Sequence, residues 1–277
     1  MGLINTNSRE NSTKVSLYYE DYGKGQPIIL IHGWPLSHRM WDAQIEILVE
    51  AGFRVIVYDR RGFGQSSKPY SGYTYNTLAN DLNDLIQTLN LKKVILCGFS
   101  MGGGEVARYI GKYGTDNVDK AILIGAVTPF LKETKNNKNG VDESVFQGMK
   151  EGIDGDRAGF FKDFGKNFVS FDKLQDKVSL AQVELNWSIA MQASKKATLD
   201  CVDAFGLTDF REDMKSFDIP TLIVHGDSDQ IVPFEVSGKK AHKLLKNSTL
   251  RIITDGPHGL SFTHPDELNT AILEFIK

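Results

Sequence analysis

The sequence predicts an α/β fold with a mostly parallel central sheet, helices on both of its faces and a helical segment inserted after a central strand. Three observations support this prediction. Short apolar runs typical of buried strands alternate with helically spaced apolar residues, both before residue 128 and after residue 207. Between these positions only helical patterns occur. A serine flanked by glycines, Ser100, joins one strand pattern directly to a helix pattern.

The N-terminal part alternates strands and helices from residue 15 onward. A strand over residues 15–22 is expected to form a hairpin with a strand over 27–31, around a turn that contains Gly23 and Gly25. The elements expected next are a helix at 40–50, a strand at 54–58, a helix at 75–89, a strand at 94–97, a helix at 105–113 and a strand at 121–124. Alternation of this kind implies parallel strands with right-handed crossovers, so a site should lie at their carboxyl ends.

The alternation stops at residue 128. A polar run rich in lysine and asparagine at 132–140 is followed by aromatic-rich helical segments at 145–149, 160–168, 178–191 and 197–205. Because the insertion follows the carboxyl end of a strand, we expect residues 128–207 to form a helical cap over that end, with 1–127 and 208–277 as the core domain. The core resumes with a strand at 221–225, a helix at 234–245, a strand at 249–253 and a helix at 265–276.

The turn at Ser100 has the features of a nucleophile site. A strand that passes into a helix within two or three residues puts the corner residue in a strained conformation, and its neighbours two places away must lack a Cβ. Gly98 and Gly102 occupy those positions. The alternative is a phosphate-binding turn, but the sequence has neither GxGxxG nor GxxxxGK[ST]. The motif alone does not decide between the two, so the rest of the chain must.

Composition narrows the possible partners and location. The 277 residues carry a net charge of −3 with acidic and basic residues interspersed, which argues against a nucleic-acid partner. The N-terminus shows no secretory signal pattern and no apolar stretch reaches membrane-spanning length, so no membrane association is expected. The two cysteines, Cys97 and Cys201, are expected to be reduced thiols in a cytoplasmic protein.

A serine hydroxyl needs a general base, usually a histidine oriented by a carboxylate. His258 lies in a glycine-proline loop after the last strand, from which its ring can reach Ser100. Four other histidines are interpreted as structural: His38, His225, His242 and His264. Of these, His38 and His242 are expected near the surface. Asp227 and Asp229 both follow the preceding strand, in the chain order serine, aspartate, histidine. We favour Asp229, because Asp227 beside Gly226 is well placed to bond loop amides.

Two backbone amides are candidates for stabilising a developing oxyanion. Met101 N–H follows the nucleophile directly. The second amide should come from the loop after the strand at 27–31, where Pro35 has no N–H and Trp34 is the natural donor.

Five motifs in order resemble the α/β-hydrolase superfamily along nearly the whole chain, and most of all its metal-free haloperoxidase and aryl esterase group, also called non-heme chloroperoxidases or bromoperoxidases. The motifs are His32-Gly-Trp-Pro-Leu36, Tyr58-Asp-Arg-Arg-Gly-Phe-Gly-Gln-Ser66, Gly98-Phe-Ser-Met-Gly-Gly103, His225-Gly-Asp-Ser-Asp-Gln-Ile-Val-Pro233 and Gly256-Pro-His-Gly259. The resemblance maps the catalytic aspartate to Asp229 and the oxyanion amides to Trp34 and Met101. It implies no cofactor and no metal.

The resemblance also implies an activity. Ester hydrolysis would proceed through an acyl-enzyme at Ser100, and hydrogen peroxide replacing water would form peracids from small carboxylic acids. The peracid would then oxidise bromide or chloride in solution. Pro35 after Trp34 resembles members named as haloperoxidases and favours peroxide as the attacker. Trp34, Phe130, Phe161 and Ile231 are candidate pocket residues, and a homo-oligomer is compatible with this interpretation.

Other functions remain open. The same three residues serve carbon–carbon bond and lactone hydrolases, and a ligand receptor on this fold can retain them. A haloalkane dehalogenase is disfavoured, because its turn carries an aspartate where this chain has Ser100.

Overall fold

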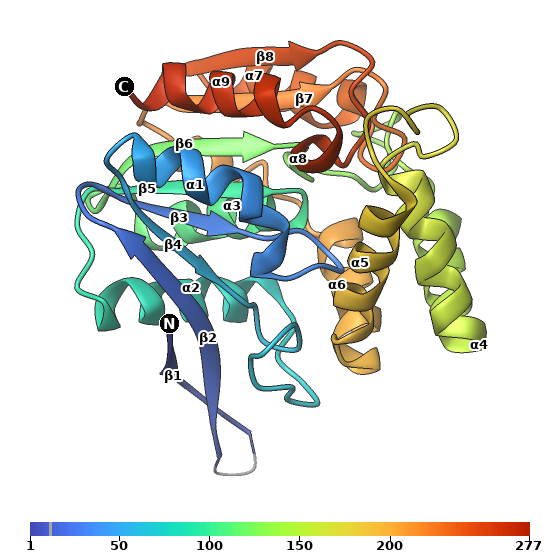
Figure 1. The fold of residues 1–277 in the computed structure, drawn as a ribbon, viewed down its shortest axis with the longest axis horizontal. Coiled ribbons are helices and arrows are strands. Elements are labelled where there is room, and N and C mark those ends of the chain that lie inside the picture. Colours follow the sequence, from blue (N-terminus) through green and yellow to red (C-terminus); the bar gives the residue numbers. More distant parts are fainter. Residues whose placement is uncertain (11–12) are drawn as a thin grey trace.

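The computed structural model describes residues 1–10 and 13–277 and confirms the α/β architecture. Eight strands form one sheet in the order β1-β2-β4-β3-β5-β6-β7-β8 (Figure 1). The pairs β1–β2 and β2–β4 are antiparallel, and all other neighbours are parallel. The strands are β1 (Gly2–Glu10), β2 (Thr13–Gly23), β3 (Pro27–Ile31), β4 (Arg54–Tyr58), β5 (Val94–Phe99), β6 (Val118–Ile124), β7 (Thr221–Gly226) and β8 (Ser248–Ile253).

Helices cover both faces of this sheet. The helices of the described residues, including those beyond the sheet, are α1 (Asp42–Glu50), α2 (Tyr75–Thr88), α3 (Met101–Tyr113), α4 (Glu143–Phe168), α5 (Leu180–Met191), α6 (Lys195–Leu207), α7 (Gly238–Leu244), α8 (Leu260–Thr263) and α9 (Pro265–Ile276), with short 3₁₀ turns at His38–Trp41, Asp213–Ser216 and Phe234–Val236. Apolar residues of α1 and α9 pack on one face, and those of α2 and α3 on the other.

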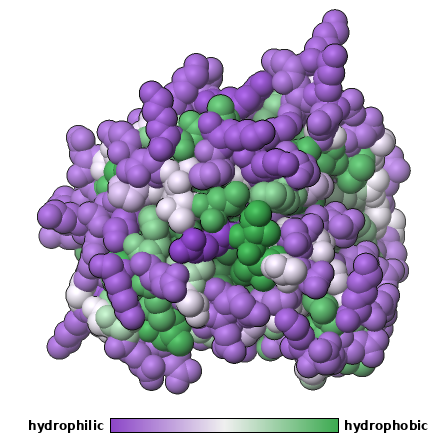
Figure 2. Space-filling model, turned by 90° about the horizontal axis from the view of Figure 1, so that it is seen from above, coloured by the Kyte–Doolittle hydropathy of each residue, from purple (hydrophilic) through white to green (hydrophobic). Residues whose placement is uncertain are grey.

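Alternation along the strands explains the two layers. In β3, Ile28 and Leu30 join the core on the α1 and α9 side, whereas Ile29 and Ile31 join the core on the α2 and α3 side. Successive side chains of a strand point to opposite faces, so a continuous apolar run is the pattern of a strand buried on both faces. Figure 2 shows one face of the exterior, where hydrophilic residues dominate and apolar residues gather in patches between them.

The expected N-terminal hairpin is wrong. The strand predicted at 15–22 lies within β2, which pairs with β4 and β1 and not with β3. Residues 24–26 therefore form a connection that carries the chain past β4, because β3 pairs with the far edge of that strand. The strand β1 was not predicted, since its buried Ile4 and Thr6 form too weak an alternation to indicate a strand.

The strands meet the inserted residues at the carboxyl edge of the sheet. Helices α4, α5 and α6 lie beyond the arrowheads of β6, β7 and β8 (Figure 1). Helix α4 consists of two helical segments, because Asp156 has non-helical angles and its Oδ1 accepts a hydrogen bond from Gly159 N–H at 2.9 Å, as an N-cap does. Within the described residues, no helix combines the length and apolar character needed to cross a bilayer.

Two glycine positions in helices provide a test of this packing. A Cβ on Gly102 would lie 2.3 Å from the carbonyl oxygen of Ile31, whereas a Cβ on Gly148 would meet nothing within 4 Å. We expect Gly102→Ala to lower the free energy of unfolding by about 3 kcal/mol, since backbone cannot yield as a side chain does. Gly148→Ala should raise it by about 0.5–1 kcal/mol. Urea unfolding of both variants measures this, and equal effects would contradict the close approach.

Candidate active site

The turn between β5 and α3 holds Ser100 in a strained conformation. Its φ is 54° and its ψ is −118°, which a residue with a side chain rarely adopts. Its N–H donates to Ile124 O at 2.8 Å, and the turn is closed by Gly103 N–H donating to Ser100 O at 3.0 Å. A Cβ on Gly98 would lie 2.4 Å from the carbonyl oxygen of Gly102, so the two glycines allow strand and helix to meet.

The structure brings Ser100, His258 and Asp229 into one hydrogen-bonded chain. His258 Nε2 lies 2.8 Å from Ser100 Oγ, and His258 Nδ1 lies 2.6 Å from Asp229 Oδ2. The three residues are 1–6% exposed. An ionised carboxylate only accepts hydrogen bonds, so Nδ1–H donates to Asp229 and Nε2 is left to accept from the serine hydroxyl. This arrangement allows the imidazole to take a proton from Ser100.

Asp229 is held ionised by its surroundings. Burial raises the pKa of its carboxyl, but the charge of His258 and hydrogen bonds from His225 and His258 outweigh burial and hold this pKa well below its usual range. Its Oδ1 also accepts from the backbone N–H groups of Ile231 and Val232 at 2.9 and 2.8 Å. Asp227 was expected to bond the loop amides, and this expectation was wrong, because Asp229 itself accepts from them.

Two backbone amides beside Ser100 are without a protein acceptor. Across residues 1–10 and 13–277, neither Trp34 N–H nor Met101 N–H donates a hydrogen bond to the protein. Met101 is the first residue of α3, where N–H groups have no partner within the helix. Both residues flank the reacting centre, since Trp34 lines the same cavity as Ser100 and Met101 follows it in the chain. These two donors are free to bind an oxyanion.

A cavity of about 40 Å³ opens onto Ser100 and His258. Its walls are otherwise almost all apolar and include Trp34, Val127, Leu131, Val141, Val145, Phe146, Met149, Phe164, Phe205, Ile231 and Val232. A cavity needs about 10–15 Å³ to hold one water, so this cavity has room for only a few atoms. Such a space suits a short acyl group.

Two of the four predicted pocket residues lie elsewhere. Trp34 and Ile231 line the cavity, but Phe130 and Phe161 do not. The Phe130 ring lies under the Arg211 guanidinium, with 5.3 Å between the ring centroid and Arg211 Cζ. The Phe161 ring packs against the Trp34 ring, and the two ring centroids are 5.5 Å apart. The sequence placed both in the insertion near the site, but which way each ring turns depends on helix packing that periodicity does not reveal.

Two histidines interpreted as structural have unexpected surroundings. His225 Nε2 lies 2.8 Å from Val232 O and 3.3 Å from Asp229 Oδ2, so this ring supports the aspartate. Its position at the end of β7, four residues before Asp229, was the available signal. His38 was expected near the surface but is 6% exposed, and its Nδ1 lies 2.7 Å from Asp59 Oδ1.

No group of three or more histidine, cysteine, aspartate or glutamate side chains in the described ranges 1–10 and 13–277 is arranged to hold a metal ion. Cys97 and Cys201 are buried and unpaired.

Comparison with known proteins identifies the family. The sequence pattern of the family described as alpha/beta hydrolase fold matches residues 26–265. The chain belongs to the α/β-hydrolase family. A non-heme chloroperoxidase of Kitasatospora aureofaciens is 41% identical over 95% of this chain and 96% of its own length. A bifunctional esterase/perhydrolase of Acinetobacter calcoaceticus is 38% identical over 95% of this α/β hydrolase and 96% of its own.

A solved structure agrees with these relatives. The crystal structure of a bromoperoxidase from Bacillus anthracis superimposes on this α/β hydrolase with a TM-score of 0.96 and 49% identity, covering 99% of both chains. The resemblance to the haloperoxidase group is thereby confirmed.

The stability of the fold should depend on pH through His38, which lies in the loop after β3. Burial lowers the pKa of its imidazole, but the hydrogen bond and charge of Asp59, with smaller contributions from Glu20 and Asp42, raise it overall. A histidine with a raised pKa in the folded state adds stability that is complete below the unfolded pKa of about 6.5 and is lost as pH rises through the folded value. The free energy of unfolding should therefore decrease as the pH rises from about 6.5 through the folded pKa of His38. In His38→Gln this decrease should be smaller.

Urea unfolding at a series of pH values from 6 to 9 measures this slope. His242→Gln is the control, because that ring lies 2.8 Å from Ser248 Oγ and forms no ion pair with a carboxylate of residues 1–10 or 13–277. Loss of the slope in the control, or its persistence in His38→Gln, would show that another group is responsible.

Proposed function

We propose that this α/β hydrolase is a serine esterase and perhydrolase that acts through an acyl-enzyme at Ser100. The observation that carries the proposal is the chain from Ser100 to His258 to Asp229, with distances of 2.8 and 2.6 Å, beside two unpaired amides. Nucleophile, base, orienting carboxylate and oxyanion donors are the parts that acyl transfer requires. The names of the relatives support the same activity.

The geometry suggests how each residue acts. His258 Nε2 takes the proton as Ser100 Oγ attacks the acyl carbon, and the carbonyl oxygen becomes an oxyanion bound by Trp34 and Met101 N–H. His258 then gives the proton to the leaving alcohol, and the acyl group remains on Ser100. Asp229 keeps the ring oriented and stabilises its positive charge. A backbone donor at the oxyanion is worth about 10²–10³ in rate.

The second half of the reaction determines the product. Water attacking the acyl-enzyme, with His258 as base, gives the carboxylic acid and regenerates Ser100. Hydrogen peroxide in the same position gives the peracid, so an ester and hydrogen peroxide become a peracid and an alcohol. When a small carboxylic acid supplies the acyl group, water leaves in place of the alcohol as Ser100 is acylated, and the overall products are a peracid and water. The peracid oxidises bromide or chloride to hypohalous acid in solution and returns to the carboxylic acid. The halide therefore needs no site on the protein.

The proposal extends to the organisation of the chain. We propose that residues 128–207 act as a cap over the core formed by 1–127 and 208–277, because cavity-lining Phe146, Phe164 and Phe205 come from α4 and α6. A cytoplasmic location is proposed from the two unpaired cysteines, Cys97 and Cys201.

The first test replaces the nucleophile. Ser100→Ala should lower kcat for aryl acetate hydrolysis by about 10⁶-fold, and bromination of a phenol dye with hydrogen peroxide, bromide and acetate should disappear with it. Both assays use the same purified protein. Bromination that survives in the variant would overturn the peracid route, whereas ester cleavage without any bromination in the wild type would leave an esterase alone.

The second test concerns acyl length. Phe146 lines the cavity, and its ring lies close above Gly206. Phe146→Ala should raise kcat/KM for an aryl butyrate relative to an aryl acetate by about tenfold or more, since each added methylene that finds room is worth about 1–3 kcal/mol. The control is Phe130→Ala, a buried phenylalanine outside the cavity. A specificity change of equal size in the control would show that Phe146 does not limit the acyl group.

A further inference from the structure

A buried ion pair behind the turn at Ser100 has no part in the chemistry proposed above. Arg60 follows β4, and its Nε–H donates to Oε2 of Glu105 at 2.8 Å. Glu105 lies in α3, in the second turn after Ser100. The two side chains are 1% and 0% exposed. Because burying both charges is often no more stable than an apolar pair of the same size, packing alone explains this pair poorly.

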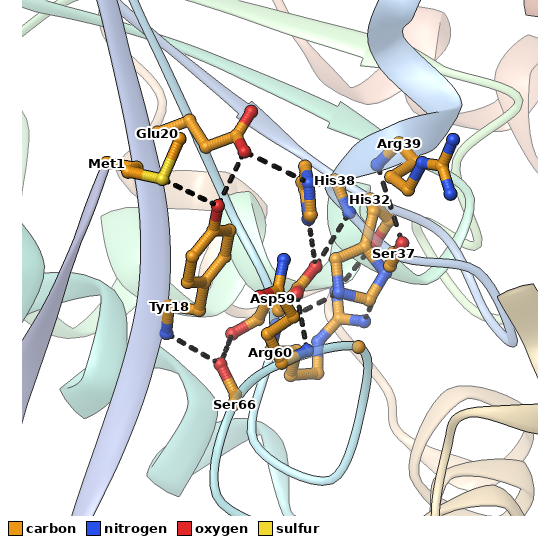
Figure 3. A network of polar contacts seen from close by, with 12 residues as sticks. Met1, Tyr18, Glu20, His32, Ser37, His38, Arg39, Asp59, Arg60 and Ser66 are labelled. Atoms are coloured by element: carbon orange, nitrogen blue, oxygen red, sulfur yellow. Dashed lines mark hydrogen bonds and ion pairs between the residues drawn. The ribbon is translucent and has the colours of Figure 1, made fainter.

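Arg60 also contacts the loop after β3. Its Nη2–H donates to the backbone oxygen of His32 at 2.8 Å, and its backbone N–H donates to His32 Nε2 at 2.9 Å (Figure 3). Because Nε2 accepts, the neutral ring carries its proton on Nδ1. Burial and the charge of Arg60 lower the pKa of the His32 imidazole to about 3, so the ring keeps this neutral tautomer at pH 7.

The His32 ring in turn helps to hold the direction of the Trp34 amide, together with Leu36 N–H, which donates to the Gly33 oxygen at 3.1 Å. Its Nδ1–H donates to the carbonyl oxygen of Gly33 at 2.8 Å. That oxygen and the Trp34 N–H belong to one planar peptide group, which is trans, so they point in opposite directions. A hydrogen bond that holds the Gly33 oxygen toward His32 therefore points the Trp34 N–H away from His32. Trp34 borders the cavity at Ser100.

We infer that Arg60, braced by Glu105, is a positioning residue that acts through His32 to aim the Trp34 amide at the oxyanion. The inference rests on the proposed function, because it assumes that an oxyanion forms at Ser100. Arg60 connects the helix that begins after the nucleophile to the loop that supplies the second donor. The two oxyanion amides are thus held in one frame, which matters because a small misplacement of a catalytic group costs much of its effect.

The chain offers a matched control in the next residue. Arg61 forms an ion pair with Asp81 of α2 that is equally buried, with side chains 3% and 2% exposed and two hydrogen bonds of 2.6 Å. Within the described part of the chain, Arg61 makes no hydrogen bond to residues 32–38. Arg60→Lys and Arg61→Lys therefore make the same substitution in two neighbouring buried ion pairs, and only one of the pairs reaches the oxyanion loop.

The experiment measures transition-state binding apart from folding. For each variant we would titrate active sites, then measure kcat and KM for an aryl acetate and the inhibition constant of phenylboronic acid, which forms a tetrahedral adduct with a serine nucleophile. Arg60→Lys should lower kcat per titrated site by about tenfold and raise the inhibition constant similarly, with KM little changed, because loss of a whole donor costs about 10²–10³. Arg61→Lys should change neither quantity.

Two outcomes would overturn the inference. One is an Arg60→Lys inhibition constant equal to that of the wild type, and the other is an equal change in Arg61→Lys. Should Arg60→Lys not fold, Glu105→Gln keeps a hydrogen-bond acceptor for Arg60 and should show the same pattern more weakly; an unchanged inhibition constant there also overturns the inference. Failure of the proposed function is seen separately, as wild-type ester cleavage that Ser100→Ala does not remove.

Discussion

The architecture of the site depends on the close approach of two backbone segments. The carbonyl oxygen of Ile31, at the end of β3, lies where a Cβ on Gly102 would stand, 2.3 Å away. Strands β3 and β5 are parallel neighbours, with Ile31 opposite Gly98. After β3 the chain forms β4 on one side of β3, and then β5 on the other side of β3. This reversal of strand order leaves a crevice at the carboxyl ends. Trp34 and Ser100 line the same cavity there.

Charge is distributed around this crevice in two different ways. Behind it, ionisable groups are buried and paired, as Arg60 is with Glu105 and Asp229 with His258. In front, the cavity walls are almost all apolar. Electrostatic interactions are stronger where water is excluded, so fixed donors at the serine act on a developing charge with little screening. The buried polar groups orient the donors and the histidine, and the apolar walls exclude water, which strengthens the interactions of these groups.

Local sequence patterns found most of the residues that meet at Ser100. Glycines two places before and after the serine indicated the nucleophile turn, and the order of serine, aspartate and histidine along the chain indicated His258 but left Asp227 and Asp229 as candidates. The resemblance to the haloperoxidase group then favoured Asp229. These signals are readable because each depends on one turn or one loop. The supporting contacts of Arg60 carried no such signal, since they depend on partners from other elements. For His225 the signal was its position four residues before Asp229. The same limit applied to the pocket, where Phe130 and Phe161 were placed wrongly.

The sequence by itself determined where the strands β3 to β8 lie and where most helices lie, because apolar periodicity and glycine positions act over short distances. Helix α8 and the middle of α4 were not predicted. It also determined that the nucleophile turn precedes a helix whose first amides are free. Only the tertiary structure decided that β2 pairs with β4, and that α4 and α6 present Phe146 and Phe205 to the cavity. The physical reason is that strand pairing and helix packing join residues far apart in the chain, and many pairings bury equal apolar area until the whole core is assembled.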